Sequence, residues 1–101
     1  MKLLIDTSDG ERIVVGLGKQ KFVADAKEEK SQKLLSFIDE VLKKQGKKMT
    51  DLSEIEVNVG PGSYTGLRVG VSVANAIGWS LGIPVNGKNL QKGGATKIRY
   101  E

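Results

Sequence analysis

The sequence predicts an α/β domain, built on a mixed five-stranded sheet with the order of elements β-β-β-α-β-α-β and with helices on at least one face. Three observations support this prediction. The first third of the chain alternates apolar and polar residues at the period of a strand, and two later segments carry apolar residues at the period of a helix. A glycine-rich turn joins a short strand to the second of these helices.

Three consecutive strands are predicted at the N-terminus. The continuous apolar run Leu3-Leu4-Ile5 suits a central strand, and a polar turn over residues 6–10 follows it. Gly18-Lys19 turns the chain again, into a half-exposed third strand that we expect to form a charged edge of the sheet. The alternating apolar positions are Ile13, Val15 and Leu17 in the second strand and Phe22, Ala24 and Ala26 in the third.

The first helix is predicted from about Ser31 to Gln45. Ser31 suits the N-cap position, and Gly46 suits the residue that follows the helix end. The segment 51–54 has the spacing of a capping box and predicts one short turn before the next strand. The apolar stripe of the helix consists of Leu34, Leu35, Phe37, Ile38, Val41 and Leu42.

The fourth strand, Ile55 to Val59, is unusual for a strand that follows a crossover helix. Such a strand runs parallel to the first strand and is normally covered on both faces. Glu56 and Asn58 nevertheless share one face of it. We therefore expect both side chains to reach solvent or a partner.

The second helix, about Thr65 to Leu81, carries a small residue at every fourth position. Glycine inside a helix costs about 1 kcal/mol relative to alanine, so the repeat is tolerable where it permits close packing. Two interpretations are open, namely packing on the sheet of the same chain and contact with a helix of another molecule. The repeat consists of Gly66, Gly70, Ala74 and Gly78.

The predicted domain spans residues 1–90. Pro84-Val85 is expected to begin the fifth strand. From Asn86 onward the chain is rich in glycine, lysine and asparagine, and we expect residues 91–101 to form a flexible basic tail.

Composition excludes several kinds of chemistry. The 101 residues contain no cysteine and no histidine, so disulfides, thiolate metal sites and the commonest general base are ruled out. The formal charge of +4 permits contact with nucleic acid without requiring it. The start of the chain reaches an acid too soon for a signal peptide, and the long apolar segment 67–85 is interrupted by Arg68, Asn75 and Pro84. We therefore expect a cytoplasmic protein without contact to a membrane.

The turn Gly60-Pro61-Gly62-Ser63 allows two interpretations. A helix that begins after a glycine-rich turn presents free backbone N–H groups and the positive end of its dipole, which attract anions. The simpler interpretation is a tight turn in which Ser63 caps the helix. A phosphate-binding P-loop is excluded because no Gly-Lys-Ser/Thr follows, and the spacing G-x-G-x-x-x-G does not fit the dinucleotide fingerprint.

Three stretches together resemble the TsaB/YeaZ family, bacterial subunits of the machinery that makes threonylcarbamoyladenosine in tRNA. They are Ile5-Asp6-Thr7-Ser8, Gln32-Lys33-Leu34-Leu35 and the nine residues 60–68. The resemblance covers about residues 1–90 and implies a ribonuclease H-like fold, which is one half of an actin-like ATPase. Family members normally continue into a second half, and they often carry a histidine where this chain has Lys30.

The resemblance implies a non-catalytic partner subunit. The expected partner is a second copy or the catalytic TsaD-type paralogue, with at most indirect contact to tRNA. The paralogue binds metal through a histidine pair, which this chain lacks, so we assign no catalytic residue and no metal site. In the family the two helices form the contact surface, and the corresponding residues here are Leu34, Leu35, Ile38, Leu42, Gly70, Val73, Ala74 and Ile77.

Two alternatives remain open. In the wider superfamily the first hairpin turn helps to hold nucleotide phosphates between two halves, so ATP and magnesium are expected here only in a complex. An enzyme of that kind would use Asp6, Thr7, Ser8, Gly60, Gly62, Ser63, Thr65 and Arg68. An RNA-binding module would instead use the basic cluster Lys43, Lys44, Lys47 and Lys48.

Overall fold

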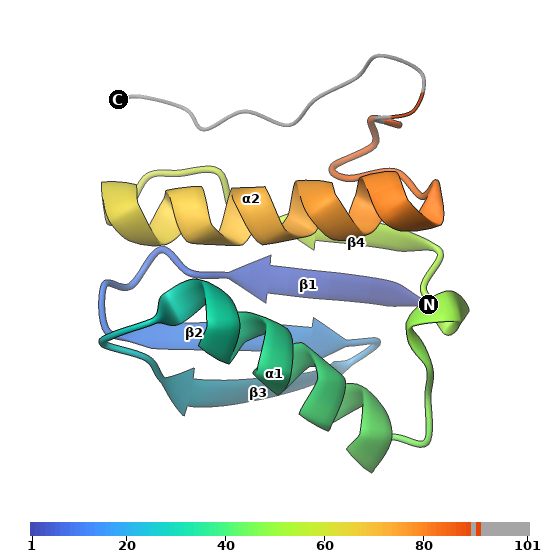
Figure 1. Ribbon diagram of the computed structural model, residues 1–101, viewed down its shortest axis with the longest axis horizontal. Helices are drawn as coiled ribbons and strands as arrows, with labels where there is room; N and C mark the ends of the chain where they lie inside the picture. Colours follow the sequence, from blue (N-terminus) through green and yellow to red (C-terminus); the bar gives the residue numbers. More distant parts are fainter. Residues whose placement is uncertain (90, 92–101) are drawn as a thin grey trace.

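The computed structural model describes residues 1–89 and residue 91, which form a four-stranded mixed sheet with two helices on one face (Figure 1). The strand order is β3-β2-β1-β4. Strand β1 pairs antiparallel with β2 and parallel with β4, and β2 pairs antiparallel with β3. The strands are β1 Lys2–Asp6, β2 Arg12–Leu17, β3 Gln20–Asp25 and β4 Glu54–Val57, and the helices are α1 Lys30–Lys44 and α2 Tyr64–Leu81.

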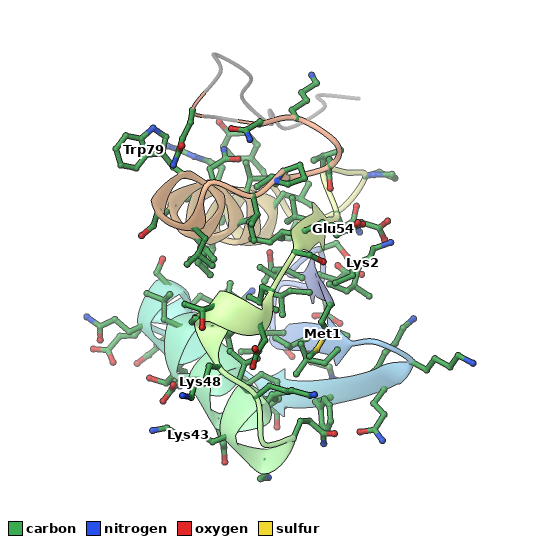
Figure 2. The ribbon with its side chains drawn as sticks, turned by 90° about the vertical axis from the view of Figure 1, so that its right-hand side faces the viewer. Met1, Lys2, Lys43, Lys48, Glu54 and Trp79 are labelled. Atoms are coloured by element: carbon green, nitrogen blue, oxygen red, sulfur yellow. The ribbon has the colours of Figure 1, made fainter. Side chains whose placement is uncertain are left out.

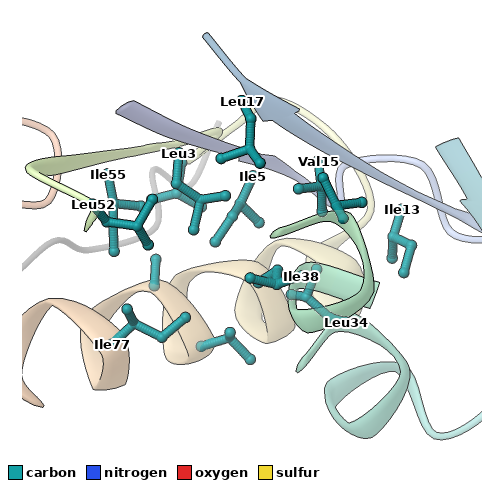
Figure 3. Close-up of a cluster of buried hydrophobic side chains, with 14 of the residues drawn as sticks. Leu3, Ile5, Ile13, Val15, Leu17, Leu34, Ile38, Leu52, Ile55 and Ile77 are labelled. Atoms are coloured by element: carbon teal, nitrogen blue, oxygen red, sulfur yellow. The ribbon is translucent and has the colours of Figure 1, made fainter. Parts of the chain in front are cut away.

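The core lies between the sheet and the two helices. Alternate residues of β1, β2 and β4 point toward the helices, as the period of a strand requires. Figure 3 shows their side chains meeting those of α1 and α2. The buried apolar side chains include Leu3, Ile5, Ile13, Val15, Leu17, Ile55 and Val57 from the sheet and Leu34, Ile38, Val41, Leu42, Val71, Val73, Ala74 and Ile77 from the helices.

The opposite face of the sheet is open and carries polar side chains beside apolar ones such as Val23, and Glu56 reaches solvent there as predicted. Glu56 is exposed, and its Oε1 atom lies 2.9 Å from Lys2 Nζ. Asn58 is half-buried. Its Nδ2 atom donates a hydrogen bond to Asp6 Oδ1, and its Oδ1 atom accepts one from the Gly60 N–H. Val23 on β3 is 60% exposed, and β3 is an outer strand of the sheet, as predicted. One face of the sheet is therefore available to solvent or to a partner.

The predicted fifth strand is wrong, because within residues 1–89 and 91 the sheet has four strands. Val85 makes a single parallel bridge to Ile55, and the chain then reverses at Asn86-Gly87. Val85 and Lys88 exchange backbone hydrogen bonds of 2.9 and 3.0 Å. Both turn residues have positive φ, 49° and 80°, which a type I′ turn requires. Asn-Gly is the strongest signal for such a turn, so the sequence contained the reason for the missing strand.

The side chain of Asn86 takes the place of a strand residue beside β4. Its Oδ1 atom accepts a hydrogen bond of 2.8 Å from the Val57 N–H, and its Nδ2 atom donates one of 2.9 Å to the Val57 carbonyl. Ile55 forms backbone hydrogen bonds with Pro84 and Asn86 on the same side. The outer edge of β4 is thereby satisfied without a fifth strand.

The helix ends agree with the sequence at α2 and differ at α1. Ser63 is the N-cap of α2, and its Oγ atom accepts a hydrogen bond of 3.2 Å from the Gly66 N–H. The predicted N-cap of α1, Ser31, lies inside the helix. The N-cap is Glu29, which has a left-handed backbone and makes no capping side-chain bond. Lys30 explains the earlier start, because its Nζ atom donates hydrogen bonds to the carbonyls of Asp9 and Gly10 and so holds the first turn of α1 against the β1–β2 loop.

The structure also describes the predicted basic cluster and the long apolar segment. The basic cluster after α1 is partly neutralised, because Lys43 Nζ lies 3.0 Å from Asp39 Oδ2 and Lys44 Nζ lies 3.9 Å from Glu40 Oε1 (Lys43 is labelled in Figure 2). In the part of the chain that the structure describes, no helix is long and apolar enough to span a bilayer. The predicted tail lies outside the described residues except for Gln91.

Candidate functional site

The glycine-rich turn packs directly on the end of β1. The Ser63 N–H donates a hydrogen bond of 2.8 Å to the Ser8 carbonyl. A Cβ atom on Gly62 would lie 2.6 Å from Ser8 Cβ and 2.9 Å from Ser8 O, closer than real Cβ atoms approach. The φ of Gly62, 157°, adds a backbone conformation that favours glycine. Gly62 therefore serves close packing of the turn on Ser8.

The first half of α2 rests on Thr7 through two further glycines. Thr7 is fully buried, and its Oγ1 atom donates a hydrogen bond to the Gly66 carbonyl. A Cβ atom on Gly66 would overlap the Thr7 carbonyl oxygen, and one on Gly70 would overlap Thr7 Oγ1. The repeat of small residues thus lets α2 approach the sheet of its own chain, which is the first of the two interpretations given above.

Asp6 is the centre of a polar cluster on the open face of the sheet. Its Oδ1 atom accepts hydrogen bonds from Ser8 N–H (2.9 Å), Ser8 Oγ (2.6 Å) and Asn58 Nδ2 (3.2 Å). Asn58 Oδ1 in turn accepts a hydrogen bond of 3.0 Å from the Gly60 N–H. Asn58 thus connects β1 to the glycine-rich turn. A polar residue between Val57 and Val59 is a sequence signal that could have indicated such a role.

The environment of Asp6 favours its ionised form. Burial raises the pKa of the Asp6 carboxyl, but the hydrogen bonds from Ser8 and Asn58 and the charge of Lys21 together lower this pKa below its ordinary value. A carboxyl with a lowered pKa in the folded state stabilises the fold above the pKa of the unfolded chain. This stabilisation is lost as the pH falls through the folded pKa.

We expect Asp6→Asn to remove part of the acid sensitivity of the fold. The wild-type free energy of unfolding should fall more steeply than that of the variant as the pH drops from neutrality to below 3.8, the ordinary pKa of an aspartate. Urea unfolding at a series of pH values measures both curves. Asp9→Asn is the matched control, because Asp9 is exposed and its carboxylate accepts one hydrogen bond, from the Glu11 N–H. Parallel curves for wild type and Asp6→Asn would contradict this role for Asp6.

The predicted anion-binding residues are distributed over two grooves and the packed turn between them. Asp6 lines a shallow groove on the open face together with Lys21, Glu56, Asn58 and Asn86. Ser63 and Thr65 line a separate groove, where the starts of α1 and α2 meet beside Lys27 and Lys30. Thr7 is buried, Gly62 packs against Ser8, and the Gly60 N–H donates a hydrogen bond to Asn58 Oδ1.

Arg68 is exposed, and its guanidinium carbon lies 5.6 Å from the centre of the Tyr64 ring. A cation over an aromatic face is a favourable arrangement within a single helix turn. Among the residues that the structure describes, no group of three or more acidic side chains could hold a metal ion.

The residues predicted as an interface lie mostly inside the domain. Leu34, Ile38 and Leu42 of α1 are at most 2% exposed, and Gly70, Val73, Ala74 and Ile77 of α2 are buried as well. Leu35 is the exception, at 45% exposure. The reason is physical: a helix that covers a sheet uses its apolar stripe for the core, so that stripe does not mark the outer surface.

The outer surface of the two helices nevertheless carries large apolar side chains that sequence reasoning missed. Trp79 is 62% exposed, and Figure 2 shows it extending from α2 away from the sheet. Tyr64, at the start of the same helix, is 50% exposed. With Leu35 on α1, these residues form what we call the helix face. Large exposed apolar side chains of this kind commonly mark contact sites.

Comparison with known proteins identifies the sequence family. Residues 24–101 match the protein family described as "TsaD: tRNA N6-adenosine threonylcarbamoyltransferase". Similar curated proteins are named tRNA threonylcarbamoyladenosine biosynthesis protein TsaB. The protein of Bacillus subtilis is 58% identical over 36 residues, which cover 36% of this chain and 16% of that protein. The protein of Buchnera aphidicola is 33% identical over 89 residues, which cover 84% of this chain and 42% of that protein.

The fold has a close counterpart among solved structures. The structure of YeaZ from Pseudomonas aeruginosa aligns with a TM-score of 0.70 and 23% identity, covering 83% of this chain and 41% of that chain. This likeness supports the predicted ribonuclease H-like, actin-like class of fold, with four strands rather than five. The chain spans less than half the length of these relatives.

Proposed function

This chain belongs to the TsaB/YeaZ family, within the TsaD-like proteins of actin-like fold, and from this premise we propose that it is a non-catalytic partner subunit in the synthesis of threonylcarbamoyladenosine in tRNA. It acts by binding another protein of the same fold through its helix face. The partner is the catalytic TsaD-type paralogue or a second copy of the chain. Contact with tRNA is made by the assembled complex.

The observation that carries the proposal is the exposure of Leu35 and Trp79 on the two helices that cover one face of the sheet. The apolar stripes of both helices pack in the core. Leu35 and Trp79 lie outside these stripes and remain largely exposed within the chain, so they bury less apolar surface than the stripe residues do. Burying a large aromatic side chain against a partner contributes strongly to binding, and tryptophan is enriched among the residues that dominate interfaces. The helix face is thus the part of the described surface that gains most from a protein partner.

The sequence supports a role without catalysis. With no histidine and no cysteine, the chain cannot supply the histidine pair with which the catalytic paralogue binds metal. Ser63 is engaged as the cap of α2, since its Oγ atom accepts a hydrogen bond from the Gly66 N–H. The predicted anion-binding residues lie on two separate surfaces, so a complete nucleotide site within this chain gains no support.

We expect Leu35→Arg and Trp79→Arg each to weaken binding to the catalytic TsaD-type protein of the same organism by at least tenfold. Each change places a charge where an apolar side chain would be desolvated. Titration calorimetry measures the dissociation constant. Val23→Arg is the matched control, because Val23 is 60% exposed, close to the 62% of Trp79, but lies on an edge strand and its side chain faces away from the helices.

The outcomes separate clearly. Loss of binding in the two helix variants, with Val23→Arg close to wild type, supports the helix face. If all three variants bind as tightly as wild type, or if the wild-type chain neither binds the paralogue nor self-associates through these residues, the proposal fails. Circular dichroism of each variant checks that the fold is retained, which exposure of the replaced side chains favours.

A further inference from the structure

Strand β3 lies at one edge of the sheet, and in the described part of the chain no other strand pairs with its outer side (Figure 1). The Ala26 N–H donates a hydrogen bond of 2.8 Å to the Glu11 carbonyl, directly beyond the register of β2 and β3. These two residues form a hydrogen-bonded pair, and such pairs alternate with non-hydrogen-bonded ones along an antiparallel ladder. The backbone N–H and C=O groups of Lys21, Val23 and Asp25 therefore point away from β2.

The side chains of these three residues form a charge pattern along the open face of the sheet. All three are exposed. Lys21 precedes Val23 by two residues and Asp25 follows it by two, so opposite charges flank an apolar centre. Edge strands commonly carry charges that repel a second strand. Opposite charges placed symmetrically about Val23 instead attract a reversed copy of the same strand.

We propose that β3 of a second copy of this chain adds to this edge as an antiparallel strand, with a twofold axis between the two Val23 residues. Val23 then lies opposite Val23 of the second copy, and Lys21 of each copy lies opposite Asp25 of the other. All these pairs are hydrogen-bonded, because both members direct their backbone groups across the interface. Strand addition of this kind gives affinity through the main chain. The contact is isologous, so it closes as a dimer with one continuous sheet.

The charges select this register among the antiparallel ones that bring the free backbone groups together. A slip to the next such register places Val23 opposite Lys21 or opposite Asp25, so that a charge faces an apolar side chain. A further slip places Lys21 opposite Lys21 or Asp25 opposite Asp25, and like charges directly opposite each other are destabilising. The register centred on Val23 gives each charged residue an opposite charge, and symmetry makes the favourable pair occur twice.

The same register fits the helix side of the sheet. There Phe22 of one copy lies opposite Ala24 of the other, so a large side chain faces a small one. Ala24 lines a groove of about 380 Å³ between β3 and α1, together with Ile13 and Phe37. Phe22 is half-buried within its own chain, and the proposed contact lets its ring extend into the groove of the second copy. Aromatic and apolar pairs across strands add to the stability of a sheet.

This surface is separate from the helix face. Leu35 and Trp79 lie on α1 and α2, and neither lines the groove beside β3. A chain joined to a second copy through β3 therefore keeps its helix face available to the partner proposed above. The inference goes beyond that proposed function and does not depend on it.

Charge reversal in the full chain tests the register. Lys21→Asp and Asp25→Lys should each weaken self-association at least tenfold in sedimentation equilibrium, because symmetry places like charges opposite each other at two positions. An equimolar mixture of the two variants should associate to within threefold of wild type, since every charge in the mixed pair then faces its opposite. Lys88→Asp and Glu54→Lys are the matched controls, because both are exposed and lie at the β4 side of the sheet, and they should have little effect.

The mixture separates the interface from effects within one chain. Asp25 lies opposite Arg12 on β2, and the charge of Lys21 acts on Asp6, so each single variant also disturbs its own chain. The mixture contains both disturbances, and its recovery therefore reports the contact between copies. Failure of the mixture to recover, an equal loss in the controls, or a wild-type chain that stays monomeric at the highest concentration reached would refute the proposal.

Hydrogen exchange measured by NMR provides a second test that needs no charge reversal. The amides of Lys21, Val23 and Asp25 should become more protected as the concentration of the wild-type chain rises. Val23→Arg should abolish this dependence, because it places two guanidinium groups opposite each other at the twofold axis. Leu35→Arg and Trp79→Arg should preserve it. Exchange at these amides that is independent of concentration would overturn the proposal, while binding of the TsaD-type protein through the helix face would be unaffected by that result.

Discussion

Replacing Gly66 or Gly70 by alanine is expected to lower the free energy of unfolding by about 3 kcal/mol or more. The added methyl group of Gly66→Ala would overlap the carbonyl oxygen of Thr7, and that of Gly70→Ala would overlap Thr7 Oγ1. Thr7 is fully buried and continues directly from the central strand, so it cannot move aside without shifting β1 or α2. Urea denaturation followed by circular dichroism measures the effect.

The sign of this effect separates close packing from helix propensity. Alanine inside a helix is favoured over glycine by about 1 kcal/mol, so propensity predicts that both variants are more stable than wild type. Packing against Thr7 predicts the opposite. Ala76→Gly is the control on the exposed side of the same helix, and it should cost about 1 kcal/mol by propensity alone. A stabilised Gly66→Ala or Gly70→Ala would show that α2 does not need its close approach to β1.

Ile38→Ala is expected to lower the free energy of unfolding by about 3 kcal/mol, because Ile38 is fully buried between α1, the sheet and α2. Removing buried methylene and methyl groups loses their transfer free energy and leaves a cavity that the surroundings fill only in part. Leu35→Ala, three residues earlier on the same helix, should change stability by less than about 0.5 kcal/mol. Thermal or urea unfolding of the two variants under identical conditions makes the comparison.

This pair tests how the first helix is oriented on the sheet. If Leu35→Ala were as costly as Ile38→Ala, Leu35 would belong to the core and the helix face would lose one of its residues. If both changes were mild, α1 would not be packed on the sheet as described. The expected contrast requires one side of the helix to be buried and the other to be available to a partner.

The order of the elements could be predicted from the sequence because the period of apolar residues follows directly from which side of an element is buried. Ile13, Val15 and Leu17 alternate and all three are buried in β2. The N-cap at Ser63 was predictable because a hydroxyl before a helix has one obvious partner, a free N–H of the first turn. The fifth strand was predicted wrongly because Pro84-Val85 suits the start of a strand, whereas the chain reverses directly afterwards at Asn86-Gly87.

The candidate site was less predictable, for two reasons. An apolar stripe marks the buried side of a helix, so Leu34, Ile38 and Val73 were read as a contact surface although they form the core. A polar motif does not state which face each side chain will occupy. Asp6 lines the groove on the open face of the sheet, whereas Ser63 lines the groove on the helix side. Asn58, which forms hydrogen bonds with Asp6 and Gly60, is a single polar residue whose partners depend on the folded arrangement of β1 and β4.

The position of β1 has a consequence for the order of events during synthesis. Strand β1 is made first, yet its parallel neighbour β4 and the helix that rests on Thr7 come from residues 54–81. The three-stranded meander has short-range contacts and can form early, but one edge of β1 stays uncovered until β4 emerges, and its apolar face stays uncovered until α2 has left the ribosome. Nascent chains arrested before residue 64 should therefore engage chaperones, and release from them should coincide with the emergence of α2.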